Sequence, residues 1–276
     1  MIRDILLQLA SYPSPTPDWV FDPVVRLAER FDARISVALC QVHIPRVSNF
    51  LADRLVGANE VIARENDLSR EHALRLAEAF VAQVPETVRG EQMLVDCISR
   101  AAAAQVAARG RLFDLLVLPV HGDPEQESLA EGLVFGSGRP VLLLPESARA
   151  QPWDRVILGW DGGRAAARAL ADAIPLCRAA REVRIVAVGG EKPLGHGPGL
   201  DSVREHLARH EIAAECVEIA ADGKNAGGAL LDHAAQVGAD LLVAGAFGHS
   251  RMREFILGGA TRSLIAAPTL PVLLSH

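Results

Sequence analysis

The stretch Asp240-Leu-Leu-Val-Ala-Gly-Ala-Phe-Gly248 starts with a short apolar run and ends with two closely spaced glycines. The run Leu241 to Ala244 is typical of a strand that is buried on both faces of a parallel sheet. Nine residues follow the second glycine before the pair Gly258 and Gly259, and a helical run then extends from Thr261 to Ala267 until a proline stops it. The pattern therefore predicts a strand, a glycine-rich loop and a helix.

A glycine-rich strand end followed by a helix start is suited to binding an anion. Glycines at the end of a strand let backbone N–H groups approach a ligand with no Cβ in the way. The start of a helix adds free N–H groups and the positive end of the helix dipole. We therefore expect a phosphate between the two glycine clusters, although a tight turn without a ligand is an alternative. The residues assigned to it are Gly245, Gly248, Gly258 and Gly259, with Ala260 and Thr261 at the start of the helix.

The spacing resembles that of the universal stress protein family, whose nucleotide-binding members carry Gly, two residues, Gly, nine residues, Gly, and then Ser or Thr. Gly245, Gly248 and Gly258 match the three glycines. Gly259 stands where the family has Ser or Thr, and Thr261, two residues further on, could supply a hydroxyl group. The resemblance implies ATP, or another adenine nucleotide, as the ligand.

The resemblance also extends to residues outside the glycine motif. Asp161 and the glycines after it resemble the family's Asp-Gly-Ser turn, with Gly163 in place of Ser, which implies that Asp161 lies at the adenosine end. Val188 matches a position whose backbone meets adenine. Ala244 and His249 complete the assigned set, and His249 could add positive charge near a phosphate. The alternatives are a helix N-cap for Asp161 and a core position for Val188.

The chain reads as two copies of one α/β unit. Asp114-Leu-Leu-Val in the first half parallels Asp240-Leu-Leu-Val in the second. We predict that residues 1–147 form a degenerate universal-stress-protein domain and that residues 153–276 form the domain with the glycine motif. The predicted joint is the short stretch from Glu146 to Trp153, and each copy has the length of one ordinary domain.

Strands that alternate with helices predict parallel sheets covered on both faces. The predicted fold is two tandem, doubly wound, open parallel-sheet domains, and the resemblance implies the strand order 3-2-1-4-5. Ligands in such sheets lie outside the carboxyl ends of strands one and four. The apolar strands Pro140–Leu144 and Pro271–Ser275 are edges that proteins tend to cover. They could pair within one chain, as a pseudo-dimer of the two domains, or between two chains, as a homodimer.

The first half lacks the features of the predicted site. No aspartate follows its first strand, which ends at Leu9-Ala-Ser-Tyr12. Acidic residues follow its fourth strand, and their charges would repel a phosphate. These acids are Asp123, Glu125, Glu127 and Glu131. We therefore expect a structural role for this half, as a partner for the second half or as a platform.

Composition excludes several classes of protein. The net charge of −6 and the absence of a basic block argue against a nucleic-acid surface. Neither lysine, Lys192 nor Lys224, lies in a P-loop pattern. No apolar run approaches the ~20 residues of a membrane span, so we expect a cytoplasmic protein with no membrane partner. The four scattered cysteines predict small buried residues of a reducing cytoplasm, not a disulfide framework or a zinc site.

Two other patterns have simpler interpretations than a functional site. His206 and His210 are four residues apart, a spacing that can place two metal ligands on one helix face, but we interpret them as an exposed face. An apolar series could form a groove for a partner, but a helix packed on the sheet explains it more simply. That series comprises Val61, Leu68, Leu74, Leu76 and Phe80. No metal site and no catalytic residue are predicted.

The functional hypothesis is that the second half binds ATP, with or without Mg²⁺, and acts as a sensor or switch in a stress response by population shift. Slow ATP hydrolysis at the same site is an alternative, in which Asp161 could help to hold Mg²⁺. No residue is a dedicated base for a water molecule. A purely structural module is a further alternative, in which Gly163 and Gly259 mark a lost site.

Overall fold

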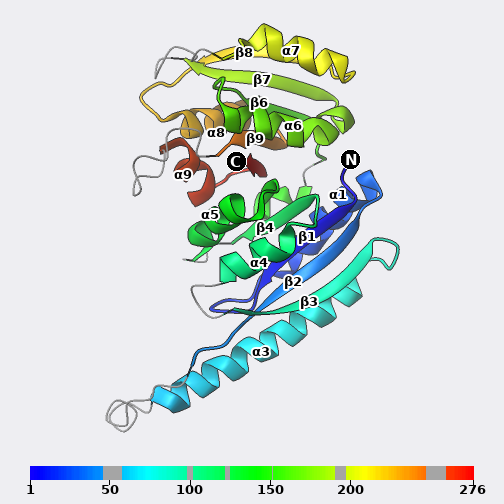
Figure 1. The fold of residues 1–276 in the computed structure, drawn as a ribbon, viewed down its shortest axis with the longest axis vertical. Coiled ribbons are helices and arrows are strands. Elements are labelled where there is room, and N and C mark those ends of the chain that lie inside the picture. Colours follow the sequence, from blue (N-terminus) through cyan, green and yellow to red (C-terminus); the bar gives the residue numbers. More distant parts are fainter. Residues whose placement is uncertain (46–57, 98–101, 122–124, 151, 190–196, 247–258) are drawn as a thin grey trace.

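The computed structural model describes residues 1–276 except 46–57, 98–101, 122–124, 151, 190–196 and 247–258. Its ten strands form one sheet in the order β3-β2-β1-β4-β5-β10-β9-β6-β7-β8 (Figure 1). Each half of the chain therefore has its own strands in the order 3-2-1-4-5, as predicted. Within each half every pairing of neighbouring strands is parallel.

The first half alternates strands and helices as the sequence predicts. Its strands are β1 (Asp4–Ala10), β2 (Arg34–Val42), β3 (Arg89–Cys97), β4 (Leu115–Val120) and β5 (Val141–Pro145). Its helices are η1 (Asp18–Val20), α1 (Phe21–Phe31), α3 (Ala58–Gln83), α4 (Ala102–Gly110), α5 (Gln126–Ser137) and η2 (Glu146–Ala150). The central strands are buried on both faces, because helices cover each side of the sheet.

The second half repeats this plan with shorter connections. Its strands are β6 (Arg155–Gly159), β7 (Glu182–Gly189), β8 (Glu215–Ala220), β9 (Leu241–Gly245) and β10 (Val272–Ser275). Its helices are α6 (Arg164–Ala179), α7 (Leu200–Arg209), α8 (Ala226–Val237) and α9 (Gly259–Ala266). Pro175 lies inside α6, and Gly238 ends α8 in the left-handed conformation.

The two halves join through their terminal strands. β5 and β10 pair in antiparallel fashion, with Leu143 opposite Val272 and Leu142 opposite Leu273. Every residue of both strands is buried. The two apolar edges therefore cover each other within one chain, which removes the exposed edge that each half would otherwise present.

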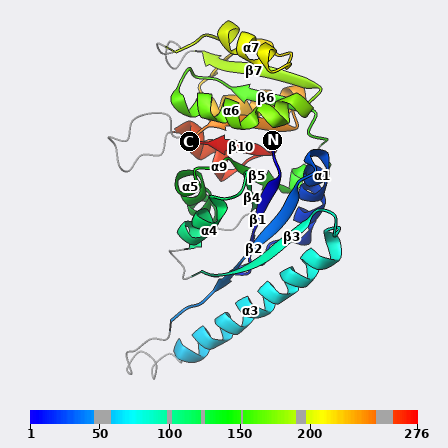
Figure 2. The same ribbon diagram turned by 45° about the vertical axis from the view of Figure 1, so that its right-hand side comes forward.

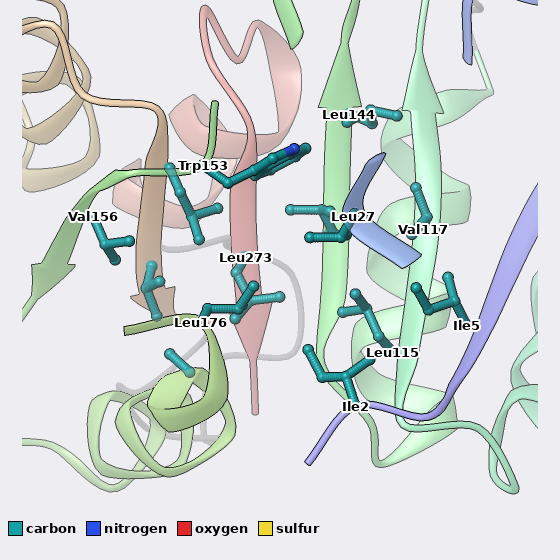
Figure 3. Close-up of a cluster of buried hydrophobic side chains, with 14 of the residues drawn as sticks. Ile2, Ile5, Leu27, Leu115, Val117, Leu144, Trp153, Val156, Leu176 and Leu273 are labelled. Carbon is teal, nitrogen blue, oxygen red and sulfur yellow. The ribbon is translucent and has the colours of Figure 1, made fainter. Parts of the chain in front are cut away.

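Two apolar cores run the length of the sheet, one on each face. The first contains residues of α1, α3, α6 and α7, and the second contains residues of α4, α5, α8 and α9. Figure 3 shows the first core at the junction, where Trp153 and Leu273 of the second half lie against Leu27 and Leu144 of the first. Both cores therefore include residues of both halves.

The helix α3 differs from the expectation of a helix packed on the sheet along its length. Leu76 and Phe80 are buried, but Val61, Leu68 and Leu74 are 45%, 38% and 60% exposed. A helix of 26 residues is about 39 Å long, whereas a strand of nine residues spans about 30 Å. The amino-terminal end of α3 therefore projects beyond the sheet (Figures 1 and 2).

Among the described residues, no helix is long and apolar enough to cross a membrane.

The carboxyl end of β4 includes a proline, which has no backbone N–H to donate to a neighbouring strand. The strand continues through Pro119 and Val120, and α5 begins at Gln126. The buried side chain of Gln126 donates a hydrogen bond to the Pro119 carbonyl and accepts one from the backbone N–H of His121 at 3.1 Å. The Gln126 amide therefore provides hydrogen-bond partners for two backbone groups at the end of the strand.

Candidate functional site

The predicted site lies at the carboxyl edge of the second half, where β6 and β9 are neighbours. Their register pairs Val156 with Leu241 and Leu158 with Val243, so the strands end side by side. The helix α6 begins five residues after Gly159, and α9 begins at Gly259. The turn after β6 and the start of α9 therefore face the same edge, which is the switch point of the sheet.

Asp161 is exposed at this edge, in the turn between β6 and α6. Its Oδ1 accepts a hydrogen bond from the backbone N–H of Gly163 at 2.8 Å. Gly162 has a φ of 75°, a conformation that favours glycine. A Cβ at Gly163 would lie 2.9 Å from Asp161 Oδ1. The carboxylate thus closes the turn that starts the helix, a structural role close to the alternative of helix capping.

Gly197 and Pro198, just before α7, lie against the same turn at the end of β6. Trp160 Nε1 donates a hydrogen bond to the Pro198 carbonyl at 2.9 Å. A Cβ at Gly197 would lie 2.3 Å from the carbonyl oxygen of Gly162, so the two backbones are in direct contact. Val188 is half-buried near the end of β7, where it packs against the second core. The sequence reasoning missed the Trp160–Pro198 contact, because no local pattern pairs residues so far apart.

Gly245 has a packing reason that the sequence did not reveal. A Cβ at this position would lie 2.3 Å from the backbone nitrogen of Ala166 and 2.4 Å from the carbonyl carbon of Ala165. The end of β9 therefore needs glycine for the close approach of the first turn of α6. Ala244 precedes it and is only 5% exposed. Only backbone groups of Ala244 and Gly245 could therefore contact a ligand.

The amino-terminal end of α9 has a graded exposure. Gly259 is exposed, Ala260 is half-buried, and Thr261 is 5% exposed. The hydroxyl group of Thr261 is thus part of the interior side of the helix. The three predicted contacts Gly248, His249 and Gly258 lie outside the described residues.

A second helix start lies beside α9. Asn225 caps α8, because its Oδ1 accepts a hydrogen bond from Gly228 N at 3.0 Å, and its Nδ2 donates to Ser263 Oγ of α9 at 2.9 Å. A Cβ at Gly227 would lie 2.1 Å from the Ala260 carbonyl oxygen, so the helices are in close contact. Asparagine before a helical run is an N-cap signal, but its contact with α9 was not predictable.

The corresponding edge of the first half is closed by its own side chains. Ala10 ends β1, in the place of Asp161. Its backbone N–H donates to Thr16 Oγ1 at 2.8 Å, and its carbonyl accepts from Thr16 N at 2.8 Å. The carboxyl end of the neighbouring strand β2 is closed similarly, because Val42 N donates to Ser69 Oγ at 2.9 Å. These groups are satisfied within the protein.

The other predicted patterns have no ligand-like arrangement in the described part of the chain. The rings of His206 and His210 meet edge to face, with centroids 4.9 Å apart. No group of three or more His, Cys, Asp or Glu side chains among the described residues could hold a metal ion. Arg262 of α9 lies near Glu131 of the first half, where its positive charge partly opposes the rise in the pKa of that carboxyl group that burial and Glu127 cause.

The duplicated sheet, with a switch point in each half, defines a tandem doubly wound α/β protein. Residues 152–276 match the sequence model of the universal stress protein family. The C-terminal half of the chain is therefore similar to the universal stress protein family, and the chain as a whole has a tandem doubly wound fold.

Solved structures support the tandem fold over the full chain. A universal stress protein from Archaeoglobus fulgidus has a TM-score of 0.69 and 15% identity, and the match covers 99% of this chain and 97% of that chain. A structure from Pseudomonas aeruginosa described as a universal stress protein has a TM-score of 0.56 and 16% identity, over 99% and 93%. A single-domain universal stress protein solved in complex with cAMP has a TM-score of 0.35 and 19% identity, over 45% and 97%. A search of curated protein sequences found no match.

Proposed function

We propose that the second half binds an adenine nucleotide, ATP, at the carboxyl edge of β6 and β9, and that binding acts as a switch in a stress response. One observation carries the proposal. The turn that contains Asp161 and the start of α9 at Gly259 lie at the ends of neighbouring strands, on the same edge. A nucleotide can span such a switch point with its two ends on different elements.

The resemblance to the universal stress protein family implies the expected orientation, and the helix starts at this edge support it. The adenosine end would lie by Asp161 and Val188, and the phosphates would lie by Gly245 and the start of α9. The amino termini of α8 and α9 lie close together, so two helix dipoles present positive ends there. The proposed phosphate contacts are Gly245, Gly248, His249, Gly258, Gly259, Ala260 and Thr261. Mg²⁺ would accompany the phosphates.

The first half would then serve as a pseudo-dimer partner that covers β10. Its own switch point offers Ala10 and Thr16 bonded to each other, so one nucleotide per chain is expected. We propose residues 1–147 and 153–276 as the two domains, and the cytoplasm as the compartment. A nucleotide that contacts the segment between Gly248 and Gly258 in only one arrangement would shift the population toward that arrangement, and a partner surface would change with it.

The sharpest test is a charge change at Gly259. A Cβ there would lie 3.6 Å from the nearest atoms, which is ordinary contact, and Asp suits the first turn of a helix. Gly259→Asp should therefore keep the fold and weaken ATP binding by at least about 10-fold, since each 1.4 kcal/mol of repulsion is a factor of ten. Gly259→Asn is the matched neutral control, and it should retain binding.

Binding would be measured by calorimetry and by mass spectrometry of small molecules released from freshly purified protein. We expect one adenine nucleotide per chain in the unmodified protein, and tighter binding in Gly259→Ser, which restores the family's hydroxyl at this position. Absence of bound nucleotide, together with an unfolding temperature indifferent to millimolar ATP, would overturn the proposal in favour of a structural module. Two nucleotides per chain would contradict the structural role of the first half.

A further inference from the structure

The outer face of the helix α3 carries apolar side chains that the rest of the described chain leaves exposed. Val61, Leu68 and Leu74 are 45%, 38% and 60% exposed. Together with Val81 they make up half of the large apolar side chains that are exposed in the described part of the chain. Such a concentration on one helix indicates an interaction surface. The buried residues of the helix, which face the sheet, are Ser69, Ala73, Leu76 and Phe80.

Exposed charges accompany these apolar residues on the outer face. Glu60 and Arg64 are four residues apart, as are Glu71 and Arg75, and Leu68 lies between the two pairs. Spacings of three, four and seven residues keep side chains on one side of a helix. Within the described part of the chain, none of these four charged side chains forms an ion pair. Their charges are therefore available to a partner.

The order of the charges reverses in sign about the point between Asp67 and Leu68. Residues at equal distances on either side of this point carry opposite charges or are both apolar. The corresponding pairs are Glu60 with Arg75, Val61 with Leu74, Arg64 with Glu71, and Glu65 with Arg70. Two antiparallel copies of a helix bring corresponding positions to the same height, and two-fold symmetry makes each contact twice. The helix is thus complementary in charge to a second, antiparallel copy of itself.

The position of α3 leaves room for such a copy. Asn66 hydrogen-bonds to both backbone groups of Ile44, just beyond β2, at 2.8 and 3.0 Å, and the part of the helix before it projects beyond the sheet (Figures 1 and 2). An antiparallel pair centred just after Asn66 places the two sheets at opposite ends of the pair, so the two copies do not collide. The terminal strands offer no alternative contact, because β5 and β10 already pair within one chain.

We propose that the chain forms a homodimer in which two copies of α3 pack antiparallel about the point between Asp67 and Leu68. Leu68 packs against Leu68 of the partner subunit at the two-fold axis. Arg64 pairs with Glu71 of the partner subunit, and Glu60 pairs with Arg75 of the partner subunit. The contact is only one helix wide, smaller than a permanent interface, so association depends on concentration and weakens as salt screens the charges. This surface is independent of the proposed nucleotide site.

The test is sedimentation equilibrium of the full chain and of charge-reversal variants over a range of concentrations. Arg64→Glu sets like charges opposite each other twice, so it should weaken dimerisation at least about 10-fold, and Glu71→Arg should do the same. The double variant, Arg64→Glu with Glu71→Arg, restores both attractive contacts and should dimerise as the unmodified chain does. The matched control is Glu205→Arg, an exposed position on α7 at the far end of the molecule from α3 (Figure 1), and it should leave dimerisation unchanged.

A mixture of the two single variants distinguishes a contact between copies from an effect within one helix. In a mixed pair the two substituted side chains attract each other, and so do the unchanged Arg64 of one variant and the unchanged Glu71 of the other. The mixture should therefore associate more strongly than either variant alone, although mixing restores no pair within a helix. An unmodified chain that stays monomeric at about 1 mM would overturn the proposal. Single variants that dimerise as the unmodified chain does, or that stay apart when mixed, would overturn it as well.

Discussion

The two halves of this protein share one fold and differ at one edge. In the first half, the backbone groups at the carboxyl ends of β1 and β2 are bonded by side chains from the connecting segments. Thr16 bonds to Ala10, Ser69 to Val42, and Asn66 to both backbone groups of Ile44. In the second half, glycines and helix starts occupy the corresponding edge. Duplication has kept the scaffold, while one copy uses its edge for internal contacts and the other has an edge suited to a ligand.

The scaffold shared by the halves includes a matched pair of carboxylates. Asp114 Oδ2 accepts hydrogen bonds from Arg3 N at 2.7 Å and Asp4 N at 3.1 Å. Asp240 Oδ2 accepts hydrogen bonds from the two equivalent backbone groups, Asp154 N and Arg155 N, both at 2.9 Å. Each aspartate precedes strand four of its half and fastens the start of strand one. The repeat visible in the sequence therefore has a structural cause.

The largest expected effect is on stability, and it distinguishes Gly245, which is needed for packing, from Gly259, which is available to a ligand. Gly245→Ala places a methyl group 2.3 Å from the backbone of α6, so we expect it to lower the free energy of unfolding by about 3 kcal/mol or more. Gly259→Ala meets only ordinary contacts and should change stability by less than about 1 kcal/mol. Urea unfolding followed by circular dichroism measures both. Equal stability of the two variants would contradict the packing role of Gly245.

Asp240 and Asp114 should contribute different amounts to the free energy of unfolding, because the two carboxylates differ in burial. Asp240 is 5% exposed and Asp114 is half-buried. We expect Asp240→Ala to cost about 2–3 kcal/mol and Asp114→Ala about 1 kcal/mol, since unsatisfied groups cost more when buried. The same urea experiment compares them. A larger loss of stability in Asp114→Ala than in Asp240→Ala would contradict the prediction that the more buried carboxylate contributes more.

The closed edge of the first half depends on Ser69. Its Oγ contacts Ser11 Oγ at 2.7 Å and accepts a hydrogen bond from Val42 N, in a site with no exposure to solvent. Ser69→Ala should destabilise the protein by about 1–2 kcal/mol, because a buried N–H loses its partner. The matched control is Ser202→Ala on α7, where the side chain is exposed and little change is expected. Hydrogen exchange at Val42 should accelerate only in the Ser69 variant.

The smallest effects are opposite pH dependences in the two halves. Burial, helped by the charge of Arg184, lowers the pKa of His233 in the second half, so protonation favours the unfolded chain and stability falls as the pH drops below about 6.5. Burial and the neighbouring Glu127 raise the pKa of Glu131 in the first half. The folded chain then binds more protons, so stability falls as the pH rises above about 4.3 and through the raised pKa.

Two variants test these contributions to the pH dependence of stability separately. His233→Asn should flatten the stability curve between pH 5 and pH 7, and Glu131→Gln should flatten it just above the ordinary range of a glutamate. Each change should be less than about 1 kcal/mol, as expected for partly exposed groups. Urea unfolding across this pH range gives the measurement. A steeper curve in either variant would contradict the sign of the corresponding pKa shift.

Local patterns predicted most of the fold. The alternation of strands and helices in both halves is as predicted, because apolar periodicity, glycine and proline signals agree along most of the chain. The end of β4 is not evident from local patterns, because Pro119 cannot donate a backbone hydrogen bond and the partners at the strand end come from Gln126 of the next helix. The packing of α3 was partly wrong because periodicity shows which residues share a face, not where the sheet ends.

The position of the candidate site at one edge of the sheet could be predicted from the sequence, but its structural details could not. The glycine spacing and Asp161 pointed to one edge, and the structure brings the turn of Asp161 and the start of α9 to neighbouring strands. The residues between them, including Gly248, His249 and Gly258, lie outside the described part, so their contacts with a nucleotide stay a prediction. Two assigned residues acquired structural roles as well, because Asp161 bonds to Gly163 and Gly245 accommodates α6.

The sequence by itself determined the duplicated α/β plan, the strand order through family resemblance, and the edge where a ligand would lie. These follow from short-range periodicity and from glycine spacing, which are properties of neighbouring residues. The tertiary structure alone decided the antiparallel pairing of β5 with β10, the contact of Asn225 with Ser263, and the packing need for Gly245. Each of these is a contact between residues far apart in the chain, and it exists only because the whole sheet brings them together.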